Sequence, residues 1–119
     1  MKIGQFIKRL NTTKDTVRHY EDMLLLHPVK GENHKEYSEQ DINDFKMIKE
    51  LQDYGLSLKD IQLIFEMKNS HQCGDIQVLK KTLQTLTIHL EELKREEEAI
   101  SLRRTMLERE LLELRDYIN

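Results

Sequence analysis

Apolar residues recur with helical spacing over four segments in the first half of the chain. They predict helices over residues 3–10 and 14–22, joined by a turn at Asn11, and two further helices that begin behind Ser38 and Ser57. Each of these serines is followed three residues later by an aspartate, which is the pattern of a capping box. The first two helices are short and closely joined, so they predict a helix-turn-helix.

The stretch of residues 24–38 has no helical period and contains Pro28, Gly31 and Asn33, which favour turns. We interpret it as an extended strand, a turn and a return strand, which together form a small β wing. Residues 1–69 are therefore predicted to form a winged helix-turn-helix domain.

From residue 76 onward the apolar positions alternate in steps of three and four, the heptad pattern of a coiled coil. A helix over residues 76–119 would be about 60 Å long, more than the preceding domain can cover, so it needs a partner helix. We place a hinge loop at residues 70–75. The a and d positions that we expect to form the dimer seam are Ile76, Leu79, Leu83, Leu86, Leu90, Leu93, Glu97, Ile100, Arg104, Leu107, Leu111, Leu114 and Ile118.

Glu97 and Arg104 interrupt this apolar seam and bear on the orientation of the two helices. In a parallel dimer in register, each residue would meet its own copy, which is an unfavourable like-charge arrangement. In an antiparallel dimer, Leu79 of one chain faces Ile118 of the other, and Glu97 lies one layer from Arg104, so that opposite charges can pair. We therefore expect an antiparallel homodimer and a mainly all-α fold class.

The composition agrees with a mostly helical chain, since one proline and four glycines among 119 residues leave little material for the turns of an all-β fold. The formal net charge of −3 by itself argues against a nucleic-acid partner. The charge is unevenly distributed, however, with a net of +2 over residues 1–38, −3 over residues 39–69 and −2 over residues 70–119. A nucleic acid would therefore bind at the first zone.

Other classes of protein are disfavoured by what the sequence lacks. No apolar run approaches the roughly 20 residues of a membrane span, and residues 1–10 lack the apolar stretch of a signal peptide, so we expect a cytoplasmic protein with no membrane partner. Cys73 is the single cysteine, which excludes an intrachain disulfide. No glycine-rich phosphate loop, paired-histidine metal motif or nucleophile elbow occurs, and we expect no enzyme activity.

Several segments resemble the MerR family of bacterial transcription regulators: Lys2–Phe6, Thr13–Glu21 with Leu24–Leu26 after it, Lys35–Ser38 and Tyr54–Ile61. The resemblance implies a dimer that binds a two-fold operator in the spacer of a promoter, where the −10 and −35 elements are too widely separated. It further implies that the dimer bends and untwists the spacer, with RNA polymerase at the same promoter.

The resemblance assigns candidate DNA contacts to the second helix and the wing, with one more in the fourth helix. Arg18 is the best candidate because its planar guanidinium can bind a base or a phosphate bidentately. Lys35 stands where the family usually has arginine, so we expect the wing to add affinity more than sequence discrimination. The candidate residues are Lys14, Thr16, Arg18, His19, Tyr20, Asn33, His34, Lys35, Tyr37 and Lys59.

Four of these residues have a second interpretation. Arg18 alternatively forms a surface salt bridge to a neighbouring aspartate, and Tyr20 is either a phosphate donor or a buried core tyrosine. Tyr37 either contacts the DNA backbone or fixes the wing to the domain. Lys59 either reaches a phosphate beside the free N–H groups of a helix start or remains solvated.

Cys73 stands where the metal-sensing branch of the family has a ligand cysteine. Three interpretations remain open: a metal site shared with His71, a thiol sensor, and a hinge cysteine without a role. The cysteine loop that closes such metal sites is absent, so we assign no metal and no cofactor. Because the heptads run to the last residue, we also expect no separate ligand-binding domain.

A DNA-independent coiled-coil adaptor is the main alternative to a DNA-binding regulator. In such a protein the front domain merely caps the long helix. The heptad pattern fits both hypotheses equally. Only residues 14–20 and the wing distinguish the DNA-binding regulator from the adaptor.

Overall fold

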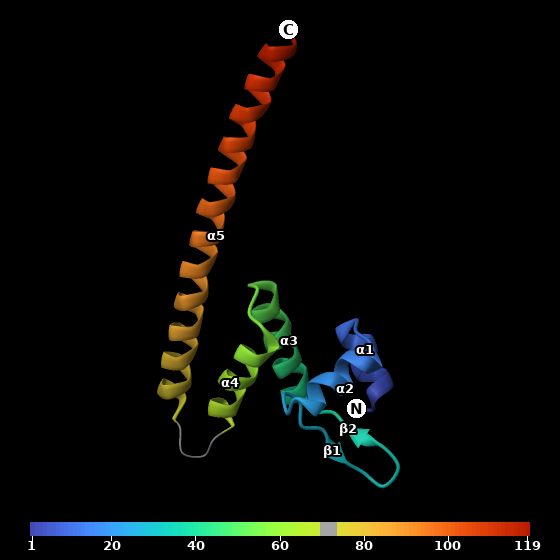
Figure 1. Ribbon diagram of the computed structural model, residues 1–119. Helices are drawn as coiled ribbons and strands as arrows, with labels where there is room; N and C mark the ends of the chain where they lie inside the picture. Colours follow the sequence, from blue (N-terminus) through green and yellow to red (C-terminus); the bar gives the residue numbers. More distant parts are fainter. Residues whose placement is uncertain (70–73) are drawn as a thin grey trace. The chain divides into compact units, whose positions relative to one another are not determined.

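The structure, a computed structural model, describes residues 1–69 and 74–119 and contains two compact units, Met1–Leu79 and Lys80–Asn119. The described residues are mainly helical with one small antiparallel sheet, as the apolar pattern predicts (Figure 1). The elements are α1 (Ile3–Leu10), α2 (Lys14–Asp22), β1 (Val29–Lys30), β2 (Lys35–Glu36), α3 (Glu39–Asp53), α4 (Leu58–Lys68) and α5 (Asp75–Ile118).

Two serines cap the starts of helices α3 and α4, as predicted, but only Ser38 forms the complete capping box. The Ser38 hydroxyl accepts a hydrogen bond from the backbone N–H of Asp41 at 3.2 Å, and the Asp41 carboxylate accepts one from the backbone N–H of Ser38 at 2.9 Å. At the start of α4, the Ser57 hydroxyl accepts from the backbone N–H of Asp60 at 3.2 Å. These bonds satisfy N–H groups that have no partner inside the helix.

Three helices of the first unit close with a residue in the left-handed conformation. These residues are Asn11 after α1 (φ 51°), Leu24 after α2 (φ 61°) and Gly55 after α3 (φ 93°). In each case the next residue donates its N–H to a carbonyl five positions earlier, for example Leu25 to Tyr20 at 2.9 Å, which is the Schellman arrangement. Asparagine and glycine tolerate this conformation, whereas leucine does not, and nothing in the sequence around Leu24 indicates it.

The core of the first unit is aromatic at its centre. Phe6 of α1 is fully buried, stacks on Tyr37 with ring centroids 4.4 Å apart, and meets the edge of Phe45 of α3 at 6.1 Å. Helix α1 packs on α2 and α3, and α3 packs on α4. The buried apolar side chains are Phe6, Val17, Tyr20, Leu25, Leu26, Tyr37, Ile42, Phe45, Ile48, Leu51, Leu56, Ile61, Ile64 and Phe65.

The predicted wing is a short β ribbon that extends from the helices of the first unit (Figure 1). Val29 pairs with Glu36 and Lys30 pairs with Lys35, and the turn is closed by a bond from the Gly31 N–H to the His34 carbonyl at 2.7 Å. A Cβ at Gly31 would lie 2.9 Å from that carbonyl oxygen, so the turn requires glycine.

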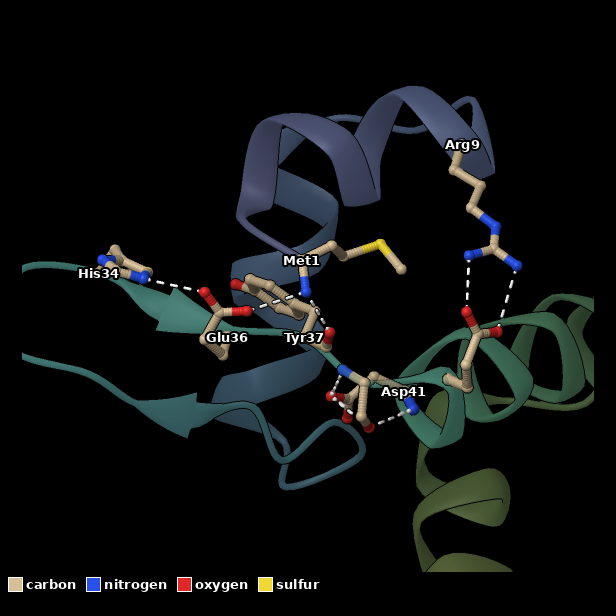
Figure 2. Close-up of polar contacts among 8 residues, drawn as sticks. Met1, Arg9, His34, Glu36, Tyr37 and Asp41 are labelled. Atoms are coloured by element: carbon tan, nitrogen blue, oxygen red, sulfur yellow. Dashed lines mark hydrogen bonds and ion pairs between the residues drawn. The ribbon is translucent and has the colours of Figure 1, made fainter.

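One buried carboxylate holds both ends of this ribbon. Asp41, which is 3% exposed, accepts hydrogen bonds from the backbone N–H of His27 before β1 at 3.2 Å and of Ser38 after β2 at 2.9 Å. The wing is therefore fixed to the start of α3 at its base, and Figure 2 shows the contacts of Asp41 at the end of β2.

Helix α5 is continuous over 44 residues and buries none of them. Among residues 1–69 and 74–119, no helix combines the length and apolar character that crossing a bilayer requires.

Candidate nucleic-acid interface

Helix α2 buries one face against the domain and presents basic side chains to solvent on another. Lys14, Arg18 and His19 are exposed, whereas Thr16 is half-buried with its hydroxyl 3.0 Å from that of Thr13. Within the described ranges no salt bridge involves Arg18, so this structure does not form the alternative pairing with a neighbouring aspartate. The Arg18 guanidinium is available to a ligand.

The wing carries exposed polar side chains along its whole length. His34 Nε2 lies 2.9 Å from Glu36 Oε1, and Lys35 Nζ lies 3.5 Å from Glu21 Oε2 on α2. The second contact connects the wing to the second helix of the helix-turn-helix, which in such motifs is the recognition helix.

A groove of about 300 Å³, which we call the wing groove, lies between α2 and the wing. Lys2, Arg18 and Lys35 supply three cationic side chains to its lining, against the single carboxylate of Glu21. Such an excess of positive charge suits the phosphate backbone of a nucleic acid. Five of the residues predicted to contact DNA line this groove: Arg18, Asn33, His34, Lys35 and Tyr37.

Lys2 and Glu21 line the same groove and were missed by the sequence reasoning. Lys2 lies beside the wing because Met1 pairs with Tyr37: the Tyr37 N–H donates to the Met1 carbonyl at 2.7 Å, and the Met1 ammonium donates to the Tyr37 carbonyl at 2.8 Å (Figure 2). The same ammonium contacts Glu36 Oε2 at 2.9 Å. This contact, and then the hydrogen bond to His34, lower the pKa of Glu36.

Tyr20 and Tyr37 are both 3% exposed, and their hydroxyls bind within the protein. The Tyr20 hydroxyl donates to Gln52 Oε1 at 2.7 Å, and the Tyr37 hydroxyl donates to Glu21 Oε1 at 2.8 Å. Burial first, and then the Glu21 hydrogen bond, raise the pKa of Tyr37 well above its usual range, which keeps its phenol protonated. A buried phenol needs an internal acceptor, so the structure favours the core role for Tyr20 and the wing-fixing role for Tyr37.

The remaining predicted contacts lie outside the lining of the wing groove. Lys14 and His19 are exposed on α2, Thr16 is half-buried there, and Lys59 is exposed in the first turn of α4, behind Ser57. Their contact with a nucleic acid stays a prediction.

The predicted dimer seam is exposed along most of α5. Its exposed apolar side chains range from 42% exposed at Leu93 to 84% at Ile118, whereas Leu86 is half-buried. Arg104 Nε lies 3.4 Å from Glu108 Oε1 within the same helix, and both side chains are mostly exposed. The helix therefore presents the seam to solvent as a single chain.

Cys73 and the rest of the predicted sensor segment, residues 70–73, lie outside the described residues. Within residues 1–69 and 74–119, no three histidine, cysteine, aspartate or glutamate side chains come together as a candidate metal site.

The sequence of the first unit matches a known family. The family model described as MerR HTH family regulatory protein matches residues 1–68, which include the helix-turn-helix and the wing. The chain is 30% identical over 98 residues to the HTH-type transcriptional regulator ZntR homolog of Haemophilus influenzae, covering 78% of this chain and 73% of that protein.

Two further relatives are also described as regulators. An uncharacterized HTH-type transcriptional regulator of Pseudomonas aeruginosa is 27% identical over 110 residues, covering 91% of this chain and 80% of the relative. The HTH-type transcriptional regulator ZntR of Escherichia coli is 27% identical over 99 residues, covering 78% of this chain and 70% of the relative. With the family match spanning more than half of its 119 residues, the chain belongs to the MerR family of helix-turn-helix regulatory proteins.

Proposed function

We propose that the protein binds double-stranded promoter DNA as an antiparallel homodimer and regulates transcription by holding that DNA bent and untwisted. The observation that carries the DNA-binding part is the wing groove, where Arg18 of the recognition helix and Lys35 of the wing line one positively charged surface. Such a role places the protein in the cytoplasm, at the promoters that it regulates.

Different residues of this surface contact the bases and the backbone of the DNA. In the proposal α2 enters the major groove, with Arg18, Lys14 and His19 directed to base edges and nearby phosphates. Lys2 and Lys35 neutralise phosphates beside the wing, which adds affinity without reading sequence.

Further contacts come from the edges of this surface. Asn33 and His34 at the wing tip contact the backbone, Thr16 supplies a hydroxyl from α2, and Lys59 reaches a phosphate from the start of α4. Tyr20 and Tyr37 act indirectly, because their buried rings hold α2 and the wing in place.

The dimer follows from the exposure of α5. A helix of 44 residues with no buried side chain and a long stripe of leucine and isoleucine, interrupted at Glu97 and Arg104, is unstable in water unless a second helix covers the stripe. An antiparallel arrangement sets Glu97 one layer from Arg104 of the other copy, whereas a parallel one stacks like charges. The occupant of the stripe is therefore a second copy in antiparallel orientation.

Bending and untwisting of the promoter rest on family membership. Two wing grooves on one dimer bind two half-sites, and the DNA between them is deformed at a free-energy cost that the additional phosphate contacts offset. RNA polymerase then meets promoter elements in an altered relative orientation, which is how such a dimer regulates without a catalytic step.

A gel shift on the promoter region upstream of the protein's own gene tests the DNA proposal. We expect binding by the wild type and a loss of roughly fivefold to 160-fold in affinity per subunit for Arg18→Ala, because a bidentate base contact contributes about 1–3 kcal/mol. Arg9→Ala is the matched control, since Arg9 is bound to Glu39 and lies outside the wing groove. Binding by neither protein would favour the DNA-independent adaptor, whereas equal binding by wild type and Arg18→Ala would remove Arg18 from the DNA contacts.

Disulfide trapping tests the dimer independently of DNA. In a Cys73→Ser background, a chain with Leu79→Cys and Ile118→Cys is expected to cross-link position 79 of one copy to position 118 of the other. Peptide mapping of the cross-link distinguishes the two orientations, and a link between two copies of position 79 would show a parallel dimer instead.

The proposal includes no cofactor, and Cys73 is the remaining candidate for an effector. Titration with Zn(II), Cu(I) and a thiol-reactive electrophile, with DNA affinity as the readout, is expected to give the same response in wild type and Cys73→Ser. A response confined to the wild type would make Cys73 a sensor.

A further inference from the structure

Glu21 is the carboxylate that faces the cations of the wing groove. Its side chain is 10% exposed, accepts a hydrogen bond from the Tyr37 hydroxyl at 2.8 Å and pairs with Lys35 Nζ at 3.5 Å. It lies on α2 three residues after Arg18, which lines the same groove together with Lys2. An acidic group thus sits inside the surface that should attract phosphates.

A carboxylate and a phosphate compete for the same donors, because both accept charge-assisted hydrogen bonds from lysine and arginine. In the free protein Lys35 already has an anionic partner in Glu21. A DNA phosphate that binds Lys35 must share it with Glu21 or replace that partner. The negative charge also repels the phosphate itself, and it does so from a partly desolvated position where screening by salt is weak.

We propose that Glu21 is an internal counterion of the wing groove, which positions the wing through Tyr37 and lowers the affinity of the groove for any DNA by holding Lys35. The inference rests on the proposed DNA-binding function. It states that Glu21 limits the electrostatic attraction between the wing groove and DNA. Glu21 is a positioning residue, because its contacts are with Tyr37 and Lys35.

Glutamine at position 21 separates the electrostatic role from a structural one. It keeps the length of the side chain and an oxygen that can accept from the Tyr37 hydroxyl, but it removes the charge. If Glu21 only supported the wing, Glu21→Gln would leave DNA affinity unchanged or reduce it. If Glu21 is a counterion, the same substitution strengthens binding to DNA of every sequence.

The test measures binding of the full chain to a duplex of unrelated sequence and to the promoter duplex over a series of salt concentrations. One uncompensated cation more per subunit steepens the slope of log K against log salt by about 0.9, which corresponds to roughly fivefold tighter binding per subunit near 0.15 M salt. We expect this change for Glu21→Gln on both duplexes.

Asp22→Asn is the matched control. It removes the same charge from the neighbouring residue of α2, but Asp22 is exposed and does not line the wing groove. We expect a smaller gain in affinity and a smaller change in slope than for Glu21→Gln. Equal effects of the two substitutions would show that the gain in affinity comes from the net charge of the chain and not from the position of Glu21 in the groove.

A second measurement does not require the Glu21 variant to fold. Because Lys35 is partly neutralised by Glu21 and Lys2 has no such contact within the described residues, Lys35→Ala should cost less affinity for unrelated DNA than Lys2→Ala. An unchanged or flatter slope for folded Glu21→Gln, or a larger loss for Lys35→Ala than for Lys2→Ala, overturns the counterion. Failure of the wild type to bind either duplex would instead overturn the proposed function.

Discussion

At position 24, glycine is expected to give a more stable protein than alanine, which reverses their usual order. Leu24 closes α2 with φ 61° and donates its N–H to the Glu21 carbonyl at 2.9 Å. A left-handed backbone costs an L-residue with a Cβ roughly 1–2 kcal/mol, and glycine avoids this cost. Leu24→Ala keeps the strain, and Leu24→Gly removes it.

The size of the difference follows from two opposing terms. Glycine loses more conformational entropy on folding, which costs about 0.5–1 kcal/mol relative to alanine. The difference between Leu24→Gly and Leu24→Ala is therefore about 0–1.5 kcal/mol in favour of glycine, with a midpoint of roughly 0.75 kcal/mol. Both variants lose the same leucine contacts, and these are small because the side chain is 67% exposed.

Gly4 offers a control of opposite sign in the same domain. It lies in α1 without a left-handed φ, and a Cβ added there meets nothing within 4 Å. Gly4→Ala should therefore stabilise the protein by about 0.5–1 kcal/mol, since alanine has the higher helix propensity.

Urea denaturation followed by circular dichroism measures these free energies of unfolding. All variants must be compared at one protein concentration, because a dimer gains stability by mass action. Changes in the midpoint with an unchanged m-value report stability alone. If Leu24→Ala is as stable as Leu24→Gly, the left-handed turn carries no strain and the prediction is wrong.

Three further predictions concern binding, assembly and pH. Lys35→Ala should weaken binding to all DNA sequences and flatten the salt slope by up to about 0.9 per subunit, as measured by fluorescence anisotropy; an unchanged slope would remove Lys35 from the contacts. Glu97→Arg and Arg104→Glu should each weaken the homodimer, because each brings like charges together in the antiparallel register. A mixture of the two variants should form a heterodimer, which size-exclusion chromatography detects. Two stable homodimers would contradict the antiparallel register. Because the pKa of Glu36 is lowered in the folded state, its stabilising effect is present above its ordinary pKa of 4.5 and is lost as pH falls below that value. Glu36→Gln should therefore lose less stability than the wild type in urea melts below pH 4.5, and parallel losses in both proteins would exclude this contact as the cause.

The helices and their starts could be predicted because their signals are local. Ser38 and Ser57 lie next to the N–H groups that they satisfy, and Asn11 lies at the turn that it closes. The left-handed turn at Leu24 has no such signal, since leucine disfavours it. The turn occurs with the burial of Leu25 and with the hydrogen bond from the Leu25 N–H to the Tyr20 carbonyl.

Only part of the candidate site could be predicted, because several of its contacts join residues that lie far apart in the sequence. The family resemblance indicated Arg18 and Lys35, but Glu21 and Tyr37 meet across 16 residues of sequence, and Tyr20 finds its acceptor Gln52 across 32. No local pattern shows which carboxylate a folded wing will cover. The buried hydroxyls and the negative charge in the groove therefore emerge only from tertiary structure.

The attachment of the wing has a mechanical consequence. Its strands are two residues each and exposed, so the ribbon alone is marginally stable, whereas Asp41 and the stacked ring of Tyr37 fix its base to the core. The wing is thus held at its base, and its strands have little stability of their own beyond that point. In the proposed complex with DNA, the exposed tip adjusts to the width of the DNA groove, while the base of the wing stays packed against Phe6 of α1 through Tyr37.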